Sequence, residues 1–298
     1  MNIRNISICG SGVLGTQIAF QTAFSGFDVI VYDVKQELIE KAKMKFKHLG
    51  ELYKMDLKSS DNDIAEAIAR ISYSTDLADA SKNADVVIEA IPEKIEVKKS
   101  FYALLGEVAP PKTIFCTNSS TLLPSMFAQE TRRPGRFLAL HFANQIWKNN
   151  TAEIMGHSGT DPEVFDTIVK FAKNIGMIAL PLFKEHPGYI LNSLQIPLLL
   201  AGMNLYSSGV ADPHTIDKTW MIASKSPMGP FATLDLIGFE TVYNIAMNAA
   251  EAGDEQMRIG ATLLKNEYID KGKLGISTGE GFYRYPNPEY ERPEFVKS

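Results

Sequence analysis

A cluster of three glycines near the N-terminus constrains the fold of this chain more than any other feature. The apolar run at residues 3–8 leads into Gly10-Ser11-Gly12-Val13-Leu14-Gly15, and a helical pattern follows. A strand, a glycine-rich turn and a helix in this order are typical of a βαβ unit that binds a dinucleotide. In such a unit Gly10 allows the tight turn, Gly12 leaves room for a pyrophosphate, and Gly15 lets the helix pack closely on the sheet.

The residues around this motif indicate NAD as the ligand. The backbone N–H groups of Val13 and Leu14 would face the phosphates at a helix N-terminus, where unpaired donors and the helix dipole favour negative charge. Residues 28–32 are typical of a second strand, and Asp33 stands at its end. A carboxylate there accepts hydrogen bonds from the ribose hydroxyls and repels the 2′-phosphate of NADP. The alternative is that Asp33 only caps the following helix.

The order of the other apolar runs predicts an α/β fold followed by helices. Strand-like runs alternate with helical patterns at residues 85–90, 113–116, 137–140 and 177–182, with a short helix expected at 64–71. This alternation is typical of a doubly wound, mostly parallel Rossmann sheet. Beyond it only helical periods remain, at residues 188–206, 213–223, 234–252 and 254–271. We therefore predict a NAD-binding domain over residues 1–185 and an all-α C-terminal domain over residues 186–298.

Composition and charge exclude several classes of protein. The net charge is -5 and no block of lysine and arginine stands out, which argues against a nucleic-acid partner. The longest apolar run, residues 196–203, is too short to cross a bilayer. A strand begins at once and leaves no room for a cleavable signal, so we expect a cytoplasmic protein. Cys9 and Cys116 have no cysteine or histidine at metal-binding spacing, and we expect two buried thiols and no metal site.

One histidine is placed to act as a base. A dinucleotide fold implies hydride transfer, and oxidation of an alcohol also needs a base for the hydroxyl proton. Of five histidines, only His141 ends a predicted sheet strand on the cofactor's edge. Glu153 follows 12 residues later, and on a return segment its carboxylate would hold one ring nitrogen and leave the other to take the proton. The alternative is a structural histidine with a carboxylate partner.

Three further groups have two interpretations each. Residues 118–121, Asn-Ser-Ser-Thr, either form a turn or helix cap or provide a side-chain hydroxyl that hydrogen-bonds the substrate oxygen. Asn192 lies in an apolar stretch and needs either a structural partner or a substrate contact. A group of lysines follows Asp33 and forms either a solvated helix face or a phosphate-binding edge: Lys41, Lys43, Lys45, Lys47, Lys54 and Lys58.

Several separated stretches resemble the short-chain L-3-hydroxyacyl-CoA dehydrogenase family, and within it the 3-hydroxybutyryl-CoA dehydrogenase type. They are the glycine motif with Asp33, residues 89–93 with Lys98, residues 118–122, residues 141–144, residues 187–192, residues 227–231 and residues 278–283. The resemblance implies a Rossmann domain and a helical domain that usually forms the dimer interface. It also implies NAD-dependent interconversion of an (S)-3-hydroxyacyl-CoA and its 3-ketoacyl-CoA, a reaction of fatty acid metabolism.

The resemblance assigns a role to each candidate residue. His141 would be the general base and Glu153 its orienting partner, while Ser120 and Asn192 would place the substrate. The resemblance also implies which residues surround NAD. They are those of the glycine loop (Gly10, Gly12, Val13, Leu14 and Gly15), Asp33, and four further residues: Glu93, Lys98, Ser120 and Asn144.

One stretch departs from the family pattern. Where the family usually reads His-Phe-Phe-Asn-Pro and continues with apolar residues, residues 141–150 read His-Phe-Ala-Asn-Gln-Ile-Trp-Lys-Asn-Asn. We expect Trp147, Lys148 and the two asparagines to change the size and polarity of the space beside His141. Ser277 also replaces a basic residue that the family often has just before the Thr278-Gly279 motif. A free 3-hydroxy acid or another polar secondary alcohol is therefore the alternative substrate, and an NAD-binding protein without turnover is a third hypothesis.

Overall fold

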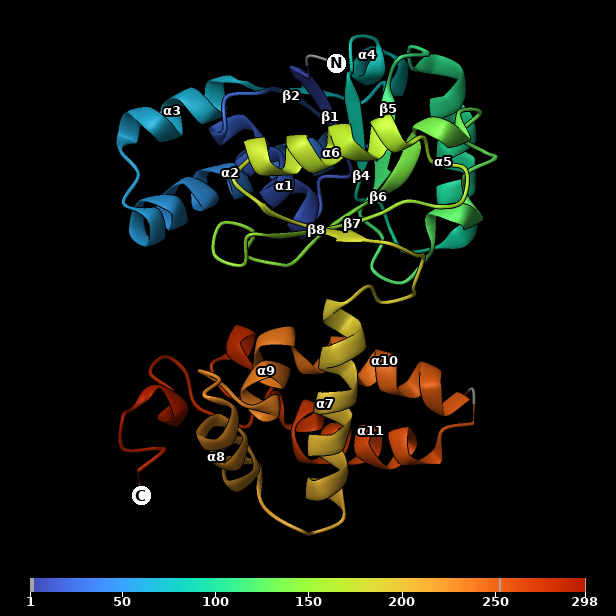
Figure 1. Cartoon of the computed structure of the whole chain (residues 1–298). Helices are drawn as coiled ribbons and strands as arrows, with labels where there is room; N and C mark the ends of the chain where they lie inside the picture. Colours follow the sequence, from blue (N-terminus) through green and yellow to red (C-terminus); the bar gives the residue numbers. More distant parts are fainter. Residues whose placement is uncertain (1–2, 252, 298) are drawn as a thin grey trace. The chain divides into compact units, whose positions relative to one another are not determined.

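The chain divides into two compact units in the computed structural model, which describes residues 3–251 and 253–297 (Figure 1). The first unit is Met1–Ile190 and the second is Leu191–Ser298. The predicted domain boundary at residue 186 lies a few residues before this division.

The first unit is built on an eight-stranded sheet in the order β3-β2-β1-β4-β5-β6-β7-β8. Its strands are β1 (Asn5–Cys9), β2 (Asp28–Tyr32), β3 (Ile71–Ser74), β4 (Val86–Glu89), β5 (Ile114–Thr117), β6 (Phe137–Phe142), β7 (Thr151–Met155) and β8 (Ile178–Leu182). Strands β1 to β6 run parallel, β7 runs antiparallel to β6, and β8 runs parallel to β7. The predicted α/β fold with a mostly parallel sheet is confirmed.

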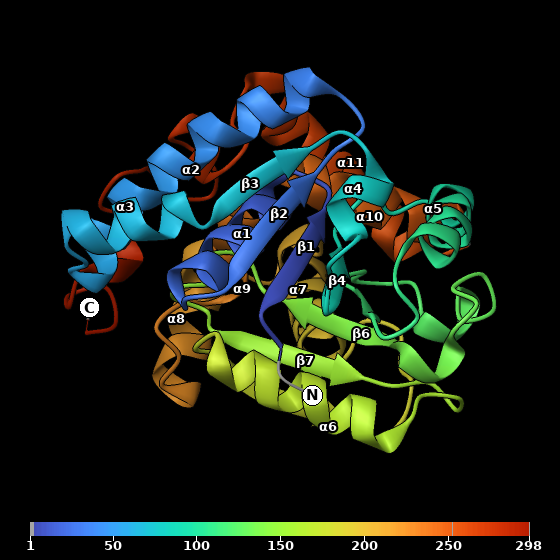
Figure 2. The same cartoon turned by 90° about the horizontal axis from the view of Figure 1, so that it is seen from above.

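Alternate residues of the strands supply two hydrophobic cores, one on each face of the sheet. Ile6 and Ile8 of β1 belong to one core, and Cys9 and Phe115 belong to the other. The first core is completed by α1 (Val13–Phe24), α2 (Gln36–Leu57), α3 (Asp61–Ala69) and α6 (Pro162–Asn174). The second is completed by α4 (Leu77–Ser81) and α5 (Ile95–Val108). Figure 2 shows α6 beside β7. Helices on both faces explain why the central strands are almost entirely apolar.

The sequence did not predict two of the strands, β3 and β7, and merged two helices; β7 was expected only as a return segment after His141. Ile71–Ser74 forms β3, whose alternating serines hid it because it lies at the edge of the sheet and is only partly buried. The helix expected at 234–252 is two helices, α9 (Pro230–Ile237) and α10 (Phe239–Glu251). They are separated by Gly238, whose φ of 90° lies in a region that favours glycine and ends α9.

The second unit is helical, as predicted. Besides α9 and α10 it contains α7 (Leu191–Ser207), α8 (Pro213–Ser224) and α11 (Glu255–Glu267). Its core includes Tyr290 and Phe295 from the C-terminal tail, so these two rings anchor the tail in the core. Among the described residues, none of the helices combines the length and the apolar character needed to span a membrane.

Candidate active site

The glycine motif forms the turn between β1 and α1, and its three glycines have different surroundings. A Cβ atom on Gly10 would lie 2.4 Å from the Ala90 carbonyl oxygen, and one on Gly15 would lie 2.0 Å from the Gly10 carbonyl oxygen. A Cβ atom on Gly12 would meet nothing within 4 Å. Packing within the protein therefore requires Gly10 and Gly15, whereas the space beside Gly12 is open. This open space at a helix N-terminus fits the pyrophosphate of a dinucleotide.

Asp33 lies at the end of β2 and binds the glycine loop. Its Oδ2 accepts hydrogen bonds from the backbone N–H of Ser11 at 2.8 Å and from the Ser11 hydroxyl at 2.6 Å. Helix α2 begins after Lys35, and no side chain caps it. The interpretation of Asp33 as a cap of this helix is therefore wrong. Its carboxylate instead lies against the turn that would hold the phosphates.

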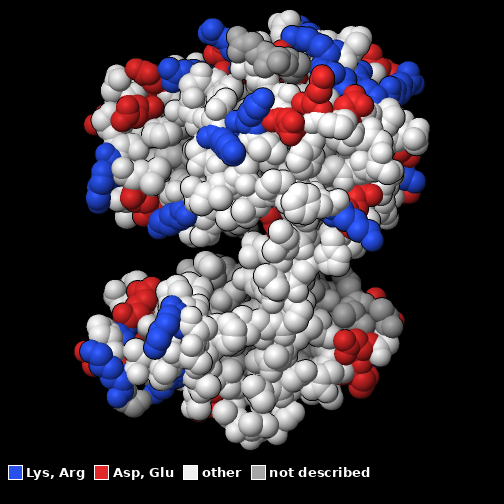
Figure 3. Space-filling model, in the orientation of Figure 1, with Lys and Arg blue, Asp and Glu red and all other residues white. Residues whose placement is uncertain are grey.

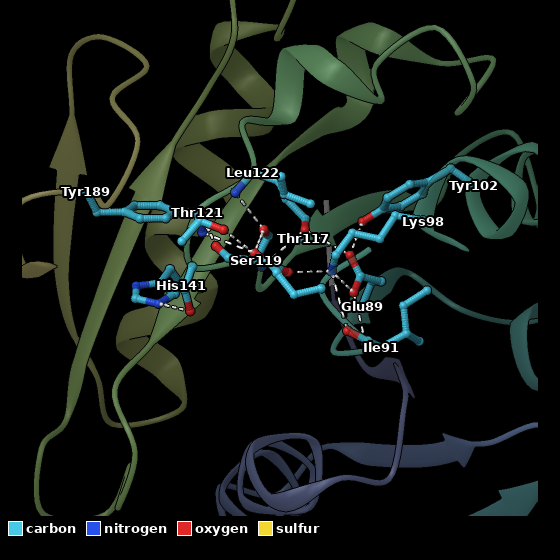
Figure 4. Close-up of polar contacts among 12 residues, drawn as sticks. Glu89, Ile91, Lys98, Tyr102, Thr117, Ser119, Thr121, Leu122, His141 and Tyr189 are labelled. Carbon is cyan, nitrogen blue, oxygen red and sulfur yellow. Dashed lines mark hydrogen bonds and ion pairs between the residues drawn. The ribbon is translucent and has the colours of Figure 1, made fainter. Parts of the chain in front are cut away.

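A buried ion pair lies at the carboxyl end of β4 (Figure 4). The Lys98 ammonium, 1% exposed, donates to Oε1 of Glu89 at 2.5 Å. The same carboxylate accepts hydrogen bonds from the Ile91 backbone N–H, the Tyr102 hydroxyl and the Thr117 hydroxyl. These donors offset the cost of burying the Glu89 charge. Helix α5 is thereby fixed to the edge of the sheet that carries the glycine loop.

Glu93 connects this ion pair to the loop that follows β5. It lies 3.2 Å from the Lys98 ammonium and accepts hydrogen bonds from the hydroxyls of Ser119 and Thr121 and from the Thr121 backbone N–H. Burial acts to raise the pKa of Glu93, but the Ser119 hydrogen bond, the Lys98 charge and the Thr121 hydrogen bonds outweigh it and leave the pKa below its ordinary value. Glu93 and Lys98 therefore form an ion pair that contacts the residues on either side of Ser120.

His141 and Glu153 are direct partners across the antiparallel β6–β7 pair. Nδ1 of His141 lies 3.0 Å from Oε2 of Glu153, and Nε2 lies 3.1 Å from the Ser120 hydroxyl. Both ionisable side chains are buried, at 5% and 3% exposure. Because an ionised carboxylate only accepts hydrogen bonds, Nδ1 carries the proton and Nε2 is free to accept one. Ser120, His141 and Glu153 thus form a relay ending at a hydroxyl.

The polar cluster after β5 divides into structural and site residues. The Asn118 side-chain oxygen accepts a hydrogen bond from the Phe142 backbone N–H at 3.0 Å and ties the ends of β5 and β6 together. Ser120 contacts His141. Asn144 is exposed on the loop after β6, where its carbonyl accepts a hydrogen bond from the Asn149 amide at 2.8 Å. Asn192 belongs to the second unit, where it is half-buried in α7.

Trp147 does not lie where the sequence predicts. Its ring packs on Tyr53 of α2, with the ring centroids 5.5 Å apart, and its indole N–H donates to Oδ2 of Asp56 at 2.8 Å. Lys148 binds Oδ1 of the same carboxylate at 2.9 Å. The expectation that Trp147 and Lys148 change the space beside His141 is therefore wrong, because Asp56 draws both side chains onto α2.

The lysines of α2 mostly form a solvated face. Lys41 pairs with Glu37, Lys43 with Glu40, and Lys54 with Glu51 and Asp61, all at exposed or partly exposed positions. Exposed pairs of this kind hold each other only weakly. Lys45 is different, because its ammonium donates to the Ser11 carbonyl at 3.1 Å and so reaches the glycine loop.

The cysteines are buried, as predicted. Burial raises the pKa of both the Cys9 and the Cys116 thiol, so neither is a reactive thiolate. Within residues 3–251 and 253–297, no three histidine, cysteine or acidic side chains lie close enough together to hold a metal ion.

Sequence reasoning did not predict the contact between Tyr189 and His141. Its ring stacks on the His141 imidazole, with centroids 4.4 Å apart and an angle of 14° between the planes (Figure 4). The signal available in the sequence was the Pro187-Gly188 turn immediately before it, which predicts a sharp change of chain direction and no particular contact.

The fold and the site define an NAD-dependent oxidoreductase of the Rossmann class. Comparison with known families is more specific. Residues 5–186 match the family model described as "3-hydroxyacyl-CoA dehydrogenase, NAD binding domain", and residues 188–285 match "3-hydroxyacyl-CoA dehydrogenase, C-terminal domain". The chain therefore belongs to the 3-hydroxyacyl-CoA dehydrogenase family, and NAD is its cofactor.

Individual relatives are similar over nearly the whole chain. The human mitochondrial hydroxyacyl-coenzyme A dehydrogenase is 31% identical over 288 residues, which cover 95% of this chain and 91% of the human one. The probable 3-hydroxybutyryl-CoA dehydrogenase of Bacillus subtilis is 31% identical over 285 residues, covering 96% and 98%. A solved diketoreductase, described as performing substrate-directed dual catalysis of dicarbonyl compounds, is 51% identical with a TM-score of 0.92, covering 96% and 100%.

Proposed function

We propose that this enzyme interconverts an (S)-3-hydroxyacyl-CoA and its 3-ketoacyl-CoA, with NAD as the hydride acceptor and with a short acyl chain. The observation that carries the proposal is the relay of Ser120, His141 and Glu153, in which both ring nitrogens of His141 have a partner. A secondary alcohol needs such a base when its hydroxyl proton and its C–H hydrogen are removed together.

Ser120, His141 and Glu153 carry out the proton transfer of the reaction. Glu153 accepts a hydrogen bond from the Nδ1–H group of His141, which leaves Nε2 without a proton. The hydroxyl of Ser120, 3.1 Å from Nε2, places the substrate oxygen next to the base. His141 takes the hydroxyl proton as the C–O bond becomes a carbonyl, and Glu153 stabilises the imidazolium that results. When bound, NAD accepts the hydride released from C3. In the reverse direction the imidazolium returns the proton to the oxygen.

The cofactor site is formed by the carboxyl ends of the parallel strands. We assign the pyrophosphate to the glycine loop, where Gly12 leaves open space, and the ribose to Asp33. Glu93, Lys98, Ser120 and Asn144 complete the proposed site. Val13 and Leu14 offer their backbone N–H groups at the start of α1.

The helical unit is proposed to bind substrate, through Asn192, and to form a homodimer. Helix α7 contains no charged residue, and Figure 3 shows few charged side chains on the face around it. Large apolar side chains are exposed on these helices, among them Leu194, Leu205, Trp220, Ile222 and Ile245. Such surface is typical of an interface. Light scattering should give about twice the 33.0 kDa mass of one chain; a mass of one chain would refute the dimer. The cytoplasmic location stays a prediction.

A second candidate function concerns the substrate. The 51% identity to a diketoreductase favours a free 3-hydroxy acid or a simple 1,3-dicarbonyl compound in place of the thioester.

One set of assays tests both candidates. NADH oxidation is followed with acetoacetyl-CoA, acetoacetate and ethyl acetoacetate, in the native enzyme and in His141→Gln. We expect acetoacetyl-CoA to have the highest kcat/KM and the variant to lose about 10²- to 10⁴-fold in kcat while its affinity for NADH stays the same. A higher kcat/KM for acetoacetate or its ester would establish the second candidate. Full turnover in His141→Gln would remove His141 from the mechanism.

A further inference from the structure

Tyr189 stands at the end of a sharp turn close to the relay. The Tyr189 backbone N–H donates to the His186 carbonyl at 3.1 Å, with Pro187 and Gly188 between them. Gly188 has a φ of 81°, so Pro and Gly occupy the positions that they favour in a type II turn. The turn brings the chain back over the ends of β6 and β7.

From this turn, residues 189 and 190 contact His141, Glu153 and the peptide bond that precedes Ser120. The Tyr189 ring lies on the face of His141, and its hydroxyl donates to the Ser119 carbonyl at 2.8 Å, which belongs to the peptide bond that precedes Ser120. The Ile190 backbone N–H donates to Oε1 of Glu153 at 2.9 Å. Tyr189 itself is only 1% exposed.

The backbone at Tyr189 is held in an unfavourable conformation. Its φ is 54°, in the left-handed region where a bulky residue is uncommon. A glycine would adopt this φ without steric cost, so the contacts of the Tyr189 side chain offset the strain. Strained residues of this kind are frequent at functional sites, where the surrounding structure fixes them.

The stacking supplies a constraint that the hydrogen bonds of His141 do not. Both hydrogen bonds lie at ring nitrogens and so act within the plane of the imidazole. They leave the ring able to tilt about the line that joins their two ends. A second ring packed at 4.4 Å on its face blocks that tilt. The π face of a phenol also favours a cation, which is the form that His141 takes after it accepts the proton.

We propose that Tyr189 is a positioning residue for the base. Its ring fixes the plane of the His141 imidazole, and its hydroxyl fixes the peptide that carries Ser120. The proposal rests on the proposed function, in which Nε2 must point at the substrate hydroxyl. Small misalignments of a reacting group are costly in rate, with about 10²-fold lost for 1 Å.

Graded variants test the proposal in the full-length enzyme. Tyr189→Phe keeps the ring and removes the hydroxyl; Tyr189→Leu and Tyr189→Met remove the ring and keep an apolar side chain. We expect Tyr189→Phe to lose less than about tenfold in kcat and the other two about 10²-fold, with KM and the NADH dissociation constant within about twofold of native. We also expect the solvent deuterium isotope effect on kcat to rise in the Leu and Met variants, because proton transfer becomes slower relative to other steps.

A control variant separates positioning from loss of structure. Phe46→Leu removes a buried ring from the core formed with α2, where it stacks on Phe20. It should lower the melting temperature without changing kcat per folded enzyme or the isotope effect. If Tyr189→Leu does not fold, Tyr189→Met gives the same measurement, and Tyr189→Phe gives the effect of the hydroxyl alone.

The results distinguish failure of this proposal from failure of the proposed function. Native kcat and isotope effect in a folded Leu or Met variant, with turnover lost in His141→Gln, would overturn the role of Tyr189 and leave the function standing. Equal loss in the Phe and Leu variants would assign the effect to the hydroxyl and overturn the stacking argument. Full turnover in His141→Gln would instead overturn the function.

Discussion

His141 and Glu153 are cross-strand neighbours, and the 3.0 Å contact between Nδ1 and Oε2 follows from that register. Residues directly opposed on an antiparallel pair have Cβ atoms about 4.5–5.5 Å apart. A histidine and a glutamate at such positions meet without any change in the backbone. The reversal of direction at β7 therefore places the Glu153 carboxylate beside the His141 imidazole.

Substitution Glu153→Gln should disable the relay while leaving the fold intact. The amide can donate to Nδ1, which favours the tautomer with a proton on Nε2 and removes the base. We expect kcat to fall by about 10²-fold or more, measured by NADH absorbance with acetoacetyl-CoA, with little change in NADH affinity. Glu163→Gln, on the exposed first turn of α6, is the matched control and should keep native turnover. An active Glu153→Gln enzyme would exclude an orienting role for Glu153.

Alanine at two glycines of the loop should have opposite effects. In Gly12→Ala the new methyl group meets no protein atom, so we expect a native melting temperature without cofactor and at least a tenfold rise in the NADH dissociation constant. In Gly15→Ala the methyl group would lie 2.0 Å from the Gly10 carbonyl oxygen. Overpacking of this kind costs about 1–3 kcal/mol or more, and we expect a clearly lower melting temperature. Unchanged NADH affinity in Gly12→Ala would place the pyrophosphate elsewhere.

Local patterns in the sequence carried the fold and much of the candidate site. The glycine loop and Asp33 each follow an apolar strand, and His141 lies near the end of another, β6; the carboxyl ends of parallel strands meet at one edge of a sheet. The helical spacing of Ile39, Ala42, Phe46 and Leu49 likewise matches the buried face of α2.

The features that the sequence missed depend on distant partners. Trp147 binds Asp56, which is 91 residues earlier, and the Tyr189 hydroxyl binds the Ser119 carbonyl 70 residues earlier. Neither contact leaves a local pattern, because a tryptophan in a polar loop or a tyrosine after a turn has many possible partners. The edge strand β3 was missed for a related reason: its neighbours in the sheet, and not its own serines, determine its pairing.

The anchoring of the loop after β6 on α2 should be measurable. The Gln17 side-chain oxygen accepts hydrogen bonds from the backbone N–H groups of Gln145 and Ile146, and Asp56 binds Trp147. Asp56→Ala leaves the buried indole N–H without its acceptor. We expect a melting temperature lower by about 2–4 °C and weaker NADH binding, because Asn144 lies on the same loop.

A second variant isolates the indole contact in this loop. Lys148→Met removes only a partly exposed ion pair to Asp56 and should have little effect on either measurement. Equal effects of Asp56→Ala and Lys148→Met would mean that the Trp147 hydrogen bond does not anchor the loop.

The helical unit should become more stable on mild acidification through Asp235. Burial raises the pKa of this carboxyl to about 6, and the charge of Asp217 adds to the shift, although the backbone N–H groups of Phe282 and Tyr283 oppose it. The folded state thus binds the proton more tightly than the unfolded state does. The stabilising contribution is complete below about pH 4 and is lost as the pH rises through about 6, and it amounts to about 3 kcal/mol.

Asp235→Asn tests this contribution because an amide does not titrate. Hydrogen exchange of the α8 and α9 amides gives the free energy of opening of the helical unit at pH 4.5 and pH 7 in both proteins. The native protein should gain stability relative to Asp235→Asn at the lower pH, since protonation removes a buried charge that is only 1% exposed. Leu264→Ala, which also disrupts the core of this unit, should differ from native by the same amount at both pH values. A difference between native and Asp235→Asn that did not change with pH would show that Asp235 titrates at its ordinary pKa.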